Sequence, residues 1–384
     1  MTEKFFCPAP WTSIYYHKDA TISPCHTNRN TYGYKSINEY AESDWLKQIK
    51  SDLKEGKVPP SCSVCFNRES RNLKSTRQQF LRLYDPNVQS YDPNARSSFI
   101  RIEMRASNLC NFKCRMCEET SSSEIQKEKE KYPILNKFTN SYRVEFDDEN
   151  DPIDDLKLFV DNNPTFDNVC FTGGEPMLIK TYYEFMDYLI EKNLQEIVTI
   201  DVFTNCSVYN PLFLERLLKF KRVLFCMSID GVGKTAEYQR HGTKWDIVEK
   251  NVLKYVMIPK EIYFNTAISP YVLLDIASLA KFLIRLYEMN NNIHARCYSV
   301  ITPQALHFAN MNNDLREMAV SQIDEAVQIL TPSNFDIFTR ELLNIKNQLQ
   351  TTEPEDTKLF VQYTKTLDKI RNESFQSTFG YKLY

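Results

Sequence analysis

The chain has 384 residues, 42% of them hydrophobic and 25% charged, with a formal net charge of −3. These proportions are typical of an ordinary globular protein. The length suits one large domain with additions, or two domains. The small net charge gives no positive field that would by itself attract nucleic acid. No apolar run reaches the roughly 18 residues of a membrane span, and the first residues do not form a signal peptide. We therefore expect a cytoplasmic protein without a membrane partner, whose eleven cysteines indicate metal binding rather than disulfides.

The first 80 residues contain four cysteines and no repeated strand–helix pattern. Cys7 precedes a Pro-Ala-Pro-Trp segment, Cys25 follows Ser-Pro, and Cys62 and Cys65 come after an amphipathic helix expected near Ile37–Glu55. The two-residue gap in the last pair is typical of zinc sites, and four thiolates also suit an iron–sulfur cluster. The spacing therefore predicts a small metal-binding module and leaves the metal open.

Residues 98–305 alternate apolar strands with amphipathic helices, which indicates βαβ units and a parallel sheet. The expected strands are Phe99–Arg105, Asn168–Thr172, Ile197–Phe203, Val223–Ile229, Glu261–Ile268 and His294–Val300. Asn210 followed by Pro211 predicts the start of a helix, because these residues suit the N-cap and first turn. From Asn312 onward the apolar spacing predicts a helical region.

Three cysteines follow the first of these strands at spacings of three residues and then two: Cys110, Cys114 and Cys117, here called the cysteine loop. Thiolates are the usual ligands of iron–sulfur clusters, and three this close can each bind a different iron of one [4Fe–4S] cube. The next cysteine is Cys170, so one iron would stay open for a small molecule, as in catalytic metal sites. Zinc is the alternative, but zinc ligands typically come as two separated pairs.

Further motifs come directly after later strands: Gly173-Gly174-Glu175-Pro176, Thr204-Asn205, and Ser228-Ile229-Asp230-Gly231. Together with the cysteine loop, and in this order, they resemble the motifs of radical S-adenosylmethionine (SAM) enzymes. The resemblance implies an α/β fold, a partial (β/α)6 barrel. Active sites of such barrels lie at the carboxyl ends of the strands, where all of these motifs stand.

The resemblance also implies a mechanism. The open iron of the cluster binds SAM, and reductive cleavage yields a 5′-deoxyadenosyl radical that abstracts hydrogen from a substrate C–H bond. The implied SAM contacts are Gly173, Gly174 and Glu175 at the ammonium, Met116 at the adenine, Asn205 at the ribose, and Ser228 and Arg240 at the carboxylate. The residue that acts on the substrate stays unknown.

Two of these contacts have ordinary alternatives. Glu175 would also be favoured in the first turn of a helix by the helix dipole, and Arg240 would also serve in a surface ion pair. Cys206 stands where the family often has glycine, so the backbone beside Asn205 departs from the family pattern.

The segments around Cys7, Cys25, Cys62 and Cys65 resemble the SPASM module or its half-size relative, twitch, which usually follows the barrel. That resemblance implies a second, auxiliary [4Fe–4S] cluster with four cysteine ligands and no open iron, acting as an electron relay or a structural clamp. A four-cysteine zinc knuckle is the alternative. His26 is not expected to be a ligand.

We therefore expect a SPASM/twitch-like module at 1–80, a radical SAM barrel at 98–310 and a helical extension at 311–384. The expected function is radical modification of a peptide or protein side chain, with a flavodoxin or ferredoxin as electron donor. One alternative is the same chemistry on a nucleotide or DNA base, as in phage DNA hypermodification. The other is a zinc-binding interaction protein on a degenerate barrel.

Overall fold

The fold is described by a computed structural model, which covers residues 5–17, 22–28, 33–34, 36–70, 74–85, 87–94, 98–139 and 152–383. The chain divides into two compact units, each assembled from three separate segments. Unit 1 comprises Met1–Ser107, Val144–Asp201 and Leu212–Val223. Unit 2 comprises Asn108–Arg143, Val202–Pro211 and Leu224–Tyr384.

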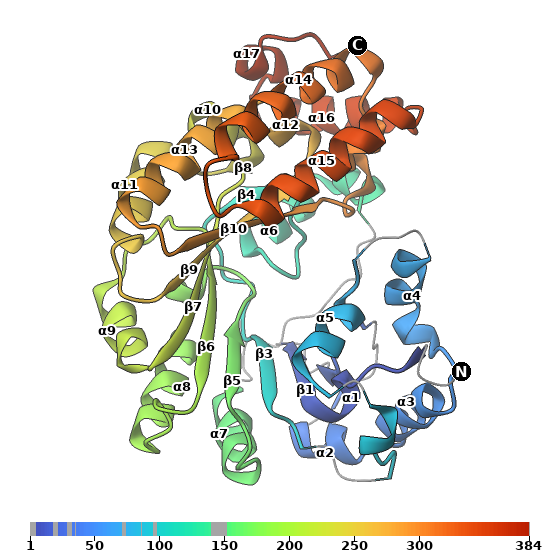
Figure 1. The fold of residues 1–384 in the computed structure, drawn as a ribbon, viewed down its shortest axis with the longest axis vertical. Helices are drawn as coiled ribbons and strands as arrows, with labels where there is room; N and C mark the ends of the chain where they lie inside the picture. The colour runs from blue at the N-terminus through green and yellow to red at the C-terminus, as the bar shows by residue number, and fades with distance from the viewer. Residues whose placement is uncertain are drawn as a thin grey trace. The chain divides into compact units, whose positions relative to one another are not determined.

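The described part of unit 1 contains four whole strands in the order β5-β3-β1-β2. They are β1 (Ser13–His17), β2 (Ile22–Ser23), β3 (Arg101–Arg105) and β5 (Asn168–Phe171). Figure 1 shows β5, β3 and β1 side by side. Strand β3 is parallel to both β1 and β5, whereas β2 pairs with β1 in the antiparallel direction. The first segment adds helices α1 (Ala9–Thr12), α2 (Ile37–Glu42), α3 (Asp44–Lys54), α4 (Ser63–Glu69) and α5 (Thr76–Leu83). Helices α7 (Ile153–Asn162), α8 (Lys180–Glu191) and α9 (Pro211–Lys219) follow later in the chain.

A cluster of apolar side chains holds the N-terminal helices of unit 1 together. Its buried members are Phe6, Trp11, Ile49 and Leu53, and Cys7 is among the partly buried residues packed against them. The burial of these large side chains supplies the main favourable free energy for this small region. It also fixes the position of Cys7 beside α3.

Unit 2 contains three parallel strands in the order β10-β9-β7, with helices between and after them. The strands are β7 (Arg222–Ser228), β9 (Glu261–Ile268) and β10 (Ile293–Ser299), and strand β6 (Thr199–Thr204) is divided between the two units. Helices α10 (Gly233–Gln239), α11 (Trp245–Tyr255), α12 (Pro270–Leu273) and α13 (Ile276–Met289) alternate with them. Unit 2 also contains a short antiparallel pair of strands, β4 (Lys113–Cys114) and β8 (Arg240–His241), and helix α6 (Ser123–Lys131).

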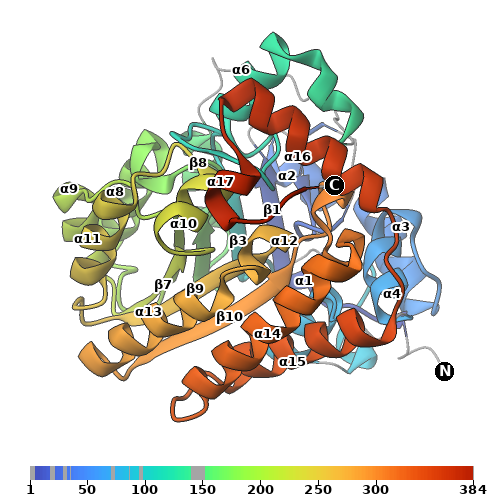
Figure 2. The same cartoon turned by 90° about the horizontal axis from the view of Figure 1, so that it is seen from above.

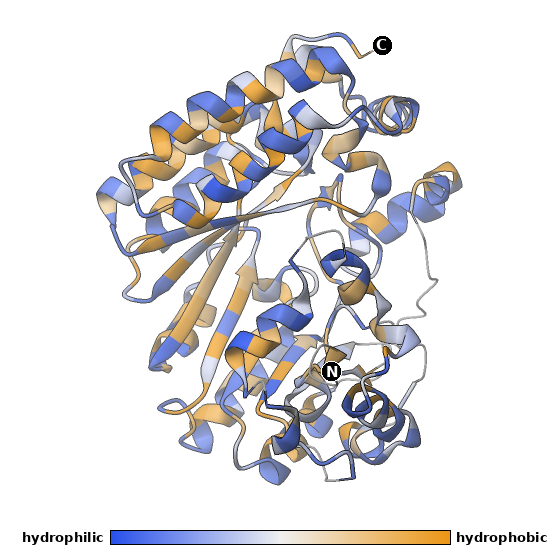
Figure 3. Ribbon diagram, turned by 45° about the vertical axis from the view of Figure 1, so that its right-hand side comes forward, coloured by the Kyte–Doolittle hydropathy of each residue, from blue (hydrophilic) through white to orange (hydrophobic). Residues whose placement is uncertain are grey.

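The C-terminal region of unit 2 is helical: α14 (Asn313–Leu330), α15 (Asp336–Thr351), α16 (Thr357–Arg371) and α17 (Phe375–Phe379). Helix α14 packs between α13 and α15 (Figures 1 and 2). Figure 3 shows hydrophobic and hydrophilic residues alternating along these helices, as expected for helices with one buried side. No helix in the described ranges is both long and apolar enough to cross a bilayer.

The structure confirms the expected fold class, a mixed α/β fold with a parallel sheet and a helical C-terminal region. All six expected strands are present, with ends within two residues of their predicted positions, and α9 begins at the predicted Pro211. The strand β1 was missed because it is a single short run of β-favouring residues, without a following helical period to mark a βα unit. The predicted boundaries at residues 80, 98 and 310 remain a prediction, since the units follow spatial contacts rather than chain order.

Candidate functional site

The cysteine loop lies in unit 2 and is held by a two-stranded pairing that local patterns did not predict. Cys114 of β4 stands opposite Arg240 of β8, and Lys113 stands opposite His241. Gly242 follows with a positive φ of 102°, and a Cβ there would lie 3.1 Å from the carbonyl oxygen of Asn111. A glycine is therefore favoured where the chain after β8 passes the loop.

Two nitrogen donors approach the sulfurs of the loop. Asn205 Nδ2 lies 3.9 Å from Cys110 Sγ, and Arg240 Nη1 lies 3.8 Å from Cys114 Sγ. Hydrogen bonds to ligand sulfurs are among the features that set the potential of an iron–sulfur cluster. Burial raises the pKa of Cys114, and the charge of Arg240 opposes this shift. The donor set therefore fits thiolates that carry negative charge when they bind a metal.

Arg240 also forms an ion pair, and the pair is not on the surface. Its Nε lies 2.7 Å from Asp230 Oδ2, with the Asp230 side chain fully buried and that of Arg240 only 14% exposed. The other carboxylate oxygen of Asp230 accepts a hydrogen bond from the backbone of Ala267. The alternative of a surface ion pair for Arg240 is therefore wrong, because Asp230 fixes the guanidinium beside Cys114.

Asn205 and its neighbours explain the departure from the glycine pattern. Asn205 Nδ2 donates to Asn111 Oδ1 at 3.1 Å, so this side chain is tied to the cysteine loop. Cys206 is buried and has a φ of 61°, in the left-handed region that usually favours glycine. Its carbonyl oxygen accepts a hydrogen bond from Asn251 Nδ2, and its N–H donates to Thr204 Oγ1. These contacts hold a cysteine in a conformation that glycine would adopt at lower cost.

Two other predicted SAM contacts in unit 2 have defined neighbours. Met116 Sδ lies 3.5 Å from Gln239 Nε2, and Ser228 ends strand β7 opposite Asn265 of β9. Unit 2 thus brings the cysteine loop together with Asn205 and Arg240.

The glycine-rich motif belongs to unit 1. Gly173 has a φ of 106°, and a Cβ there would lie 2.6 Å from Ser107 O, so no other residue fits without a shift. The N–H of Gly174 donates to the same oxygen at 3.1 Å. Glu175 is fully buried, and its carboxylate accepts from Met177 N at the start of the 3-10 helix Pro176–Leu178. Glu175 therefore caps the start of this helix.

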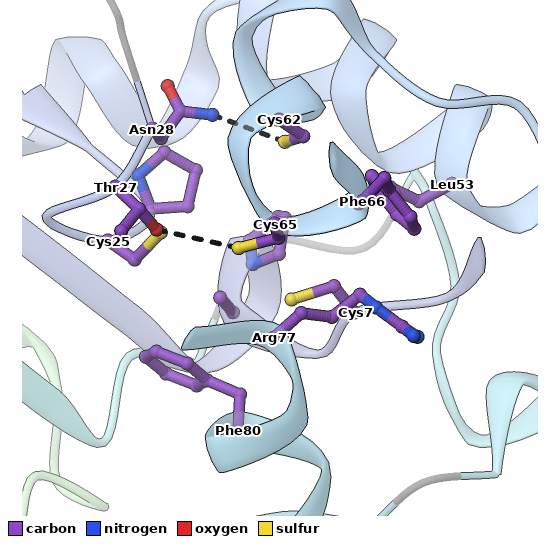
Figure 4. Close-up of a pocket in the computed structure, with 13 residues that line it drawn as sticks. Cys7, Cys25, Thr27, Asn28, Leu53, Cys62, Cys65, Phe66, Arg77 and Phe80 are labelled. Atoms are coloured by element: carbon purple, nitrogen blue, oxygen red, sulfur yellow. Dashed lines mark hydrogen bonds between the residues drawn. The ribbon is translucent and has the colours of Figure 1, made fainter. Parts of the chain in front are cut away.

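The four N-terminal cysteines converge on one pocket in unit 1 (Figure 4). Cys7, Cys25, Cys62 and Cys65 all line it, together with Thr27 and Asn28. Thr27 Oγ1 contacts the sulfurs of both Cys25 and Cys65, at 3.3 and 3.7 Å. Segments far apart in the sequence therefore present their thiols to the same space.

The electrostatics of this pocket suit a metal-binding thiol group. Burial, together with a smaller effect of the neighbouring thiolates, raises the pKa of Cys25 to about 11 and that of Cys62 to about 12. Asn28 Nδ2 donates to Cys62 Sγ at 3.3 Å, which favours the charged sulfur. Metal uptake here would therefore release protons, because the bound form needs thiolates.

His26 is directed away from these thiols. Its Nδ1 lies 3.1 Å from Glu103 Oε2 on β3, and its Nε2 lies 3.3 Å from Thr76 Oγ1. Burial alone would raise the pKa of Glu103, but the charge of His26 and its hydrogen bond lower it to about 2. His26 is thus engaged through both ring nitrogens.

None of the eleven cysteines, all of which the structure describes, forms a disulfide. Cys170, Cys226 and Cys297 are buried among the apolar residues, as expected. Within the described ranges, no group of three or more His, Cys, Asp or Glu side chains is already arranged to hold a metal ion. Metal binding by either set of cysteines is therefore a proposal.

Sequence reasoning missed Arg115, which lies between two cysteines of the loop and is fully buried. The only signal for it in the sequence was a charged residue within a metal-binding motif. It also missed Gln239, whose carbonyl oxygen accepts from Arg115 N at 2.8 Å. No local pattern indicates that contact.

No curated protein matches the chain in sequence. The structure is similar to that of anSMEcpe with bound AdoMet, at 14% identity and a TM-score of 0.43, covering 61% of this chain and 62% of that one. It is also similar to Streptococcus suis SuiB bound to precursor peptide SuiA, at 17% identity and a TM-score of 0.43, covering 76% and 61%. The chain thus spans less than two thirds of either protein, and likenesses this distant carry no information about its activity.

A family model gives the assignment of the central region. The model described as Radical SAM superfamily matches residues 104–266, which include the cysteine loop, the Gly173–Glu175 segment, Asn205, Ser228 and Arg240. Residues 104–266 of the chain therefore match the Radical SAM superfamily.

Proposed function

We propose that this protein is a radical SAM enzyme in which Cys110, Cys114 and Cys117 bind a catalytic [4Fe–4S] cluster. The observation that carries the proposal is the nitrogen donors at the loop sulfurs, with Asn205 Nδ2 at Cys110 and Arg240 Nη1 at Cys114. Nitrogen donors of this kind stabilise thiolates, which is the form in which cysteine binds iron.

The protein's own residues would bind and orient SAM. With both groups bound, the available chemistry is reductive cleavage of SAM to methionine and a 5′-deoxyadenosyl radical, which takes a hydrogen atom from a substrate C–H bond. Arg240 would hold the carboxylate through the guanidinium nitrogens that Asp230 does not engage. Met116 would supply an apolar contact for the adenine, and Ser228 a hydroxyl for the carboxylate.

The auxiliary cysteines support a second [4Fe–4S] cluster in unit 1. Four free thiols line one pocket, and Asn28 and Thr27 donate to or contact three of the four sulfurs. Four cysteine ligands would leave no open iron, so this cluster would relay electrons or clamp the N-terminal helices. Because the segments around these cysteines resemble the SPASM and twitch modules, we propose a peptide or protein side chain as the substrate.

The experiment that tests this function is anaerobic reconstitution with iron and sulfide, followed by electron paramagnetic resonance (EPR) with and without SAM. We expect about eight irons per chain, two cubes in all, an EPR signal that changes on SAM addition, and 5′-deoxyadenosine after dithionite reduction. A colourless protein that binds zinc and forms no 5′-deoxyadenosine would contradict the proposal and favour the zinc-binding interaction protein.

A narrower prediction concerns the carboxylate contact of SAM. Arg240→Ala should weaken SAM binding by about 1.5–3 kcal/mol, the usual contribution of a charge-assisted hydrogen bond. Isothermal titration of the reconstituted protein measures this change, and thermal unfolding monitors the loss of the Asp230 partner. Arg240→Lys keeps the charge beside Asp230 without the forked geometry, so it should retain the fold and weaken SAM binding less. Unchanged affinity in a folded Arg240→Ala variant would remove this residue from the SAM site.

A further inference from the structure

Among the residues that the structure describes, Arg115 of the cysteine loop has the largest fully buried side chain. It stands directly after Cys114 and two residues before Cys117. A guanidinium is costly to bury unless its charge and its donors are matched. Its partners therefore show what holds the loop in place.

Those partners come from the C-terminal region. Arg115 Nη2 lies 2.6 Å from Asp368 Oδ1 and 2.5 Å from Glu373 Oε2. The hydroxyl of Tyr363 donates to the backbone oxygen of Arg115. Asn372 takes the left-handed conformation after α16, which turns the chain between the two carboxylates. Residues some 250 positions downstream thus form the binding site for the middle of the cysteine loop.

Aromatic rings close the remaining sides of the guanidinium. Its carbon atom lies 3.6 Å from the centroid of Tyr238 and 5.4 Å from that of Tyr271. The hydroxyl of Tyr238 donates to Asp368 Oδ1, and Tyr238 and Tyr271 both pack against Phe379 of α17. Figure 2 shows α17 beside α10, the helix that ends with Tyr238 and Gln239.

A second group of ion pairs connects the end of helix α16 to the cysteine loop. Glu128 of α6 pairs with Arg371 at 2.6 Å and with Lys113 at 3.1 Å. Lys113 directly precedes Cys114, and the side chains of Glu128 and Arg371 are 4% and 1% exposed. His241 on the paired strand adds a contact of 2.6 Å to Glu373. The loop is therefore held to residues 363–373 at the two positions that flank Cys114, indirectly at Lys113 and directly at Arg115.

We propose that Asp368 and Glu373 are positioning residues of the cluster site, which hold the cysteine loop through Arg115 and set the charge beside the cluster. Helix α16 and the residues that follow it thus help to hold the proposed cluster site. This inference rests on the proposed function, because it concerns the loop that would bind the cluster. Two carboxylates against one guanidinium, with Tyr363 on the backbone, fix the loop before any metal arrives.

The test compares Glu373→Gln and Asp368→Asn with Glu317→Gln, which removes an exposed carboxylate from α14 of the same unit. Hydrogen exchange is measured on the metal-free proteins for peptides that cover residues 112–118. We expect exchange in this loop to be roughly tenfold faster or more in the two variants, as the loss of one charge-assisted hydrogen bond predicts. The Glu317→Gln control should match the wild type. Tyr363→Phe is a second route, since it loosens the loop backbone without removing any charge.

The reduction potential of the reconstituted cluster gives a readout that a purely structural role would not move. Loss of a negative charge beside the cluster favours the added electron, so the potential should become more positive in Glu373→Gln and Asp368→Asn. Loop exchange or a potential equal to that of the control, in a folded variant, would overturn the proposal. If the wild type takes up no cluster, the proposed function fails, whereas the exchange experiment still decides the positioning role.

Discussion

Replacing Cys110, Cys114 and Cys117 together with alanine is expected to abolish formation of 5′-deoxyadenosine from SAM. The three thiolates are the proposed external ligands of three irons. The remaining cysteines of unit 2 are Cys206, Cys226 and Cys297, which are buried, with Cys226 near Arg296 and Cys297 near Phe338. Without ligands the cluster has no site, and SAM loses the iron that would bind its amino and carboxylate groups. Chromatography of the products after anaerobic reduction with dithionite measures this loss.

The matched control is Cys297→Ala, which removes a buried thiol that lies 3.9 Å from a backbone oxygen and takes no part in either proposed site. It should retain full iron content and SAM cleavage. Iron analysis of the triple variant should show about four irons fewer than the wild type, one cube's worth. Continued formation of 5′-deoxyadenosine by the triple variant would refute the catalytic site.

The double variant Cys62→Ala/Cys65→Ala should lose the auxiliary cluster and keep the catalytic one. Both residues line the pocket of unit 1, whereas the cysteine loop belongs to unit 2, so the two sets of ligands are independent. Iron content should fall from about eight to about four per chain. Cleavage of SAM in the absence of substrate should persist, because the open iron is untouched.

Metal analysis of the same variant also separates the two interpretations of the pocket. If the pocket binds zinc, the wild type should contain about one zinc per chain and the variant none, with iron unchanged. An unchanged iron content without any zinc would exclude both metals from this pocket. Thermal unfolding of the variant reports whether the metal clamps the N-terminal helices, since Cys7 packs against Phe6, Trp11, Ile49 and Leu53.

Local patterns in the sequence were sufficient for the parts of this protein that short-range physics governs. The six parallel strands and the start of α9 at Pro211 follow from hydrophobic periodicity and capping, which depend on neighbouring residues. The cysteine loop was found in the same way, because its three cysteines lie within a few residues of one another. For the auxiliary cysteines the sequence indicated a shared site, and the folded chain brings Cys7, Cys25, Cys62 and Cys65 to one pocket.

Contacts between distant segments could be learned only from the folded chain. Neither the β4–β8 pairing opposite Cys114, nor the buried pair of Arg240 with Asp230, nor the carboxylates around Arg115 leaves a periodic signal. Charged residues such as Asp368 and Glu373 occur on ordinary helix surfaces, and their position in the sequence gives no sign that they meet a buried guanidinium. Which distant residues come into contact depends on how the helices pack. Because burying an unpaired charge costs free energy, the buried guanidinium of Arg115 then requires carboxylate partners.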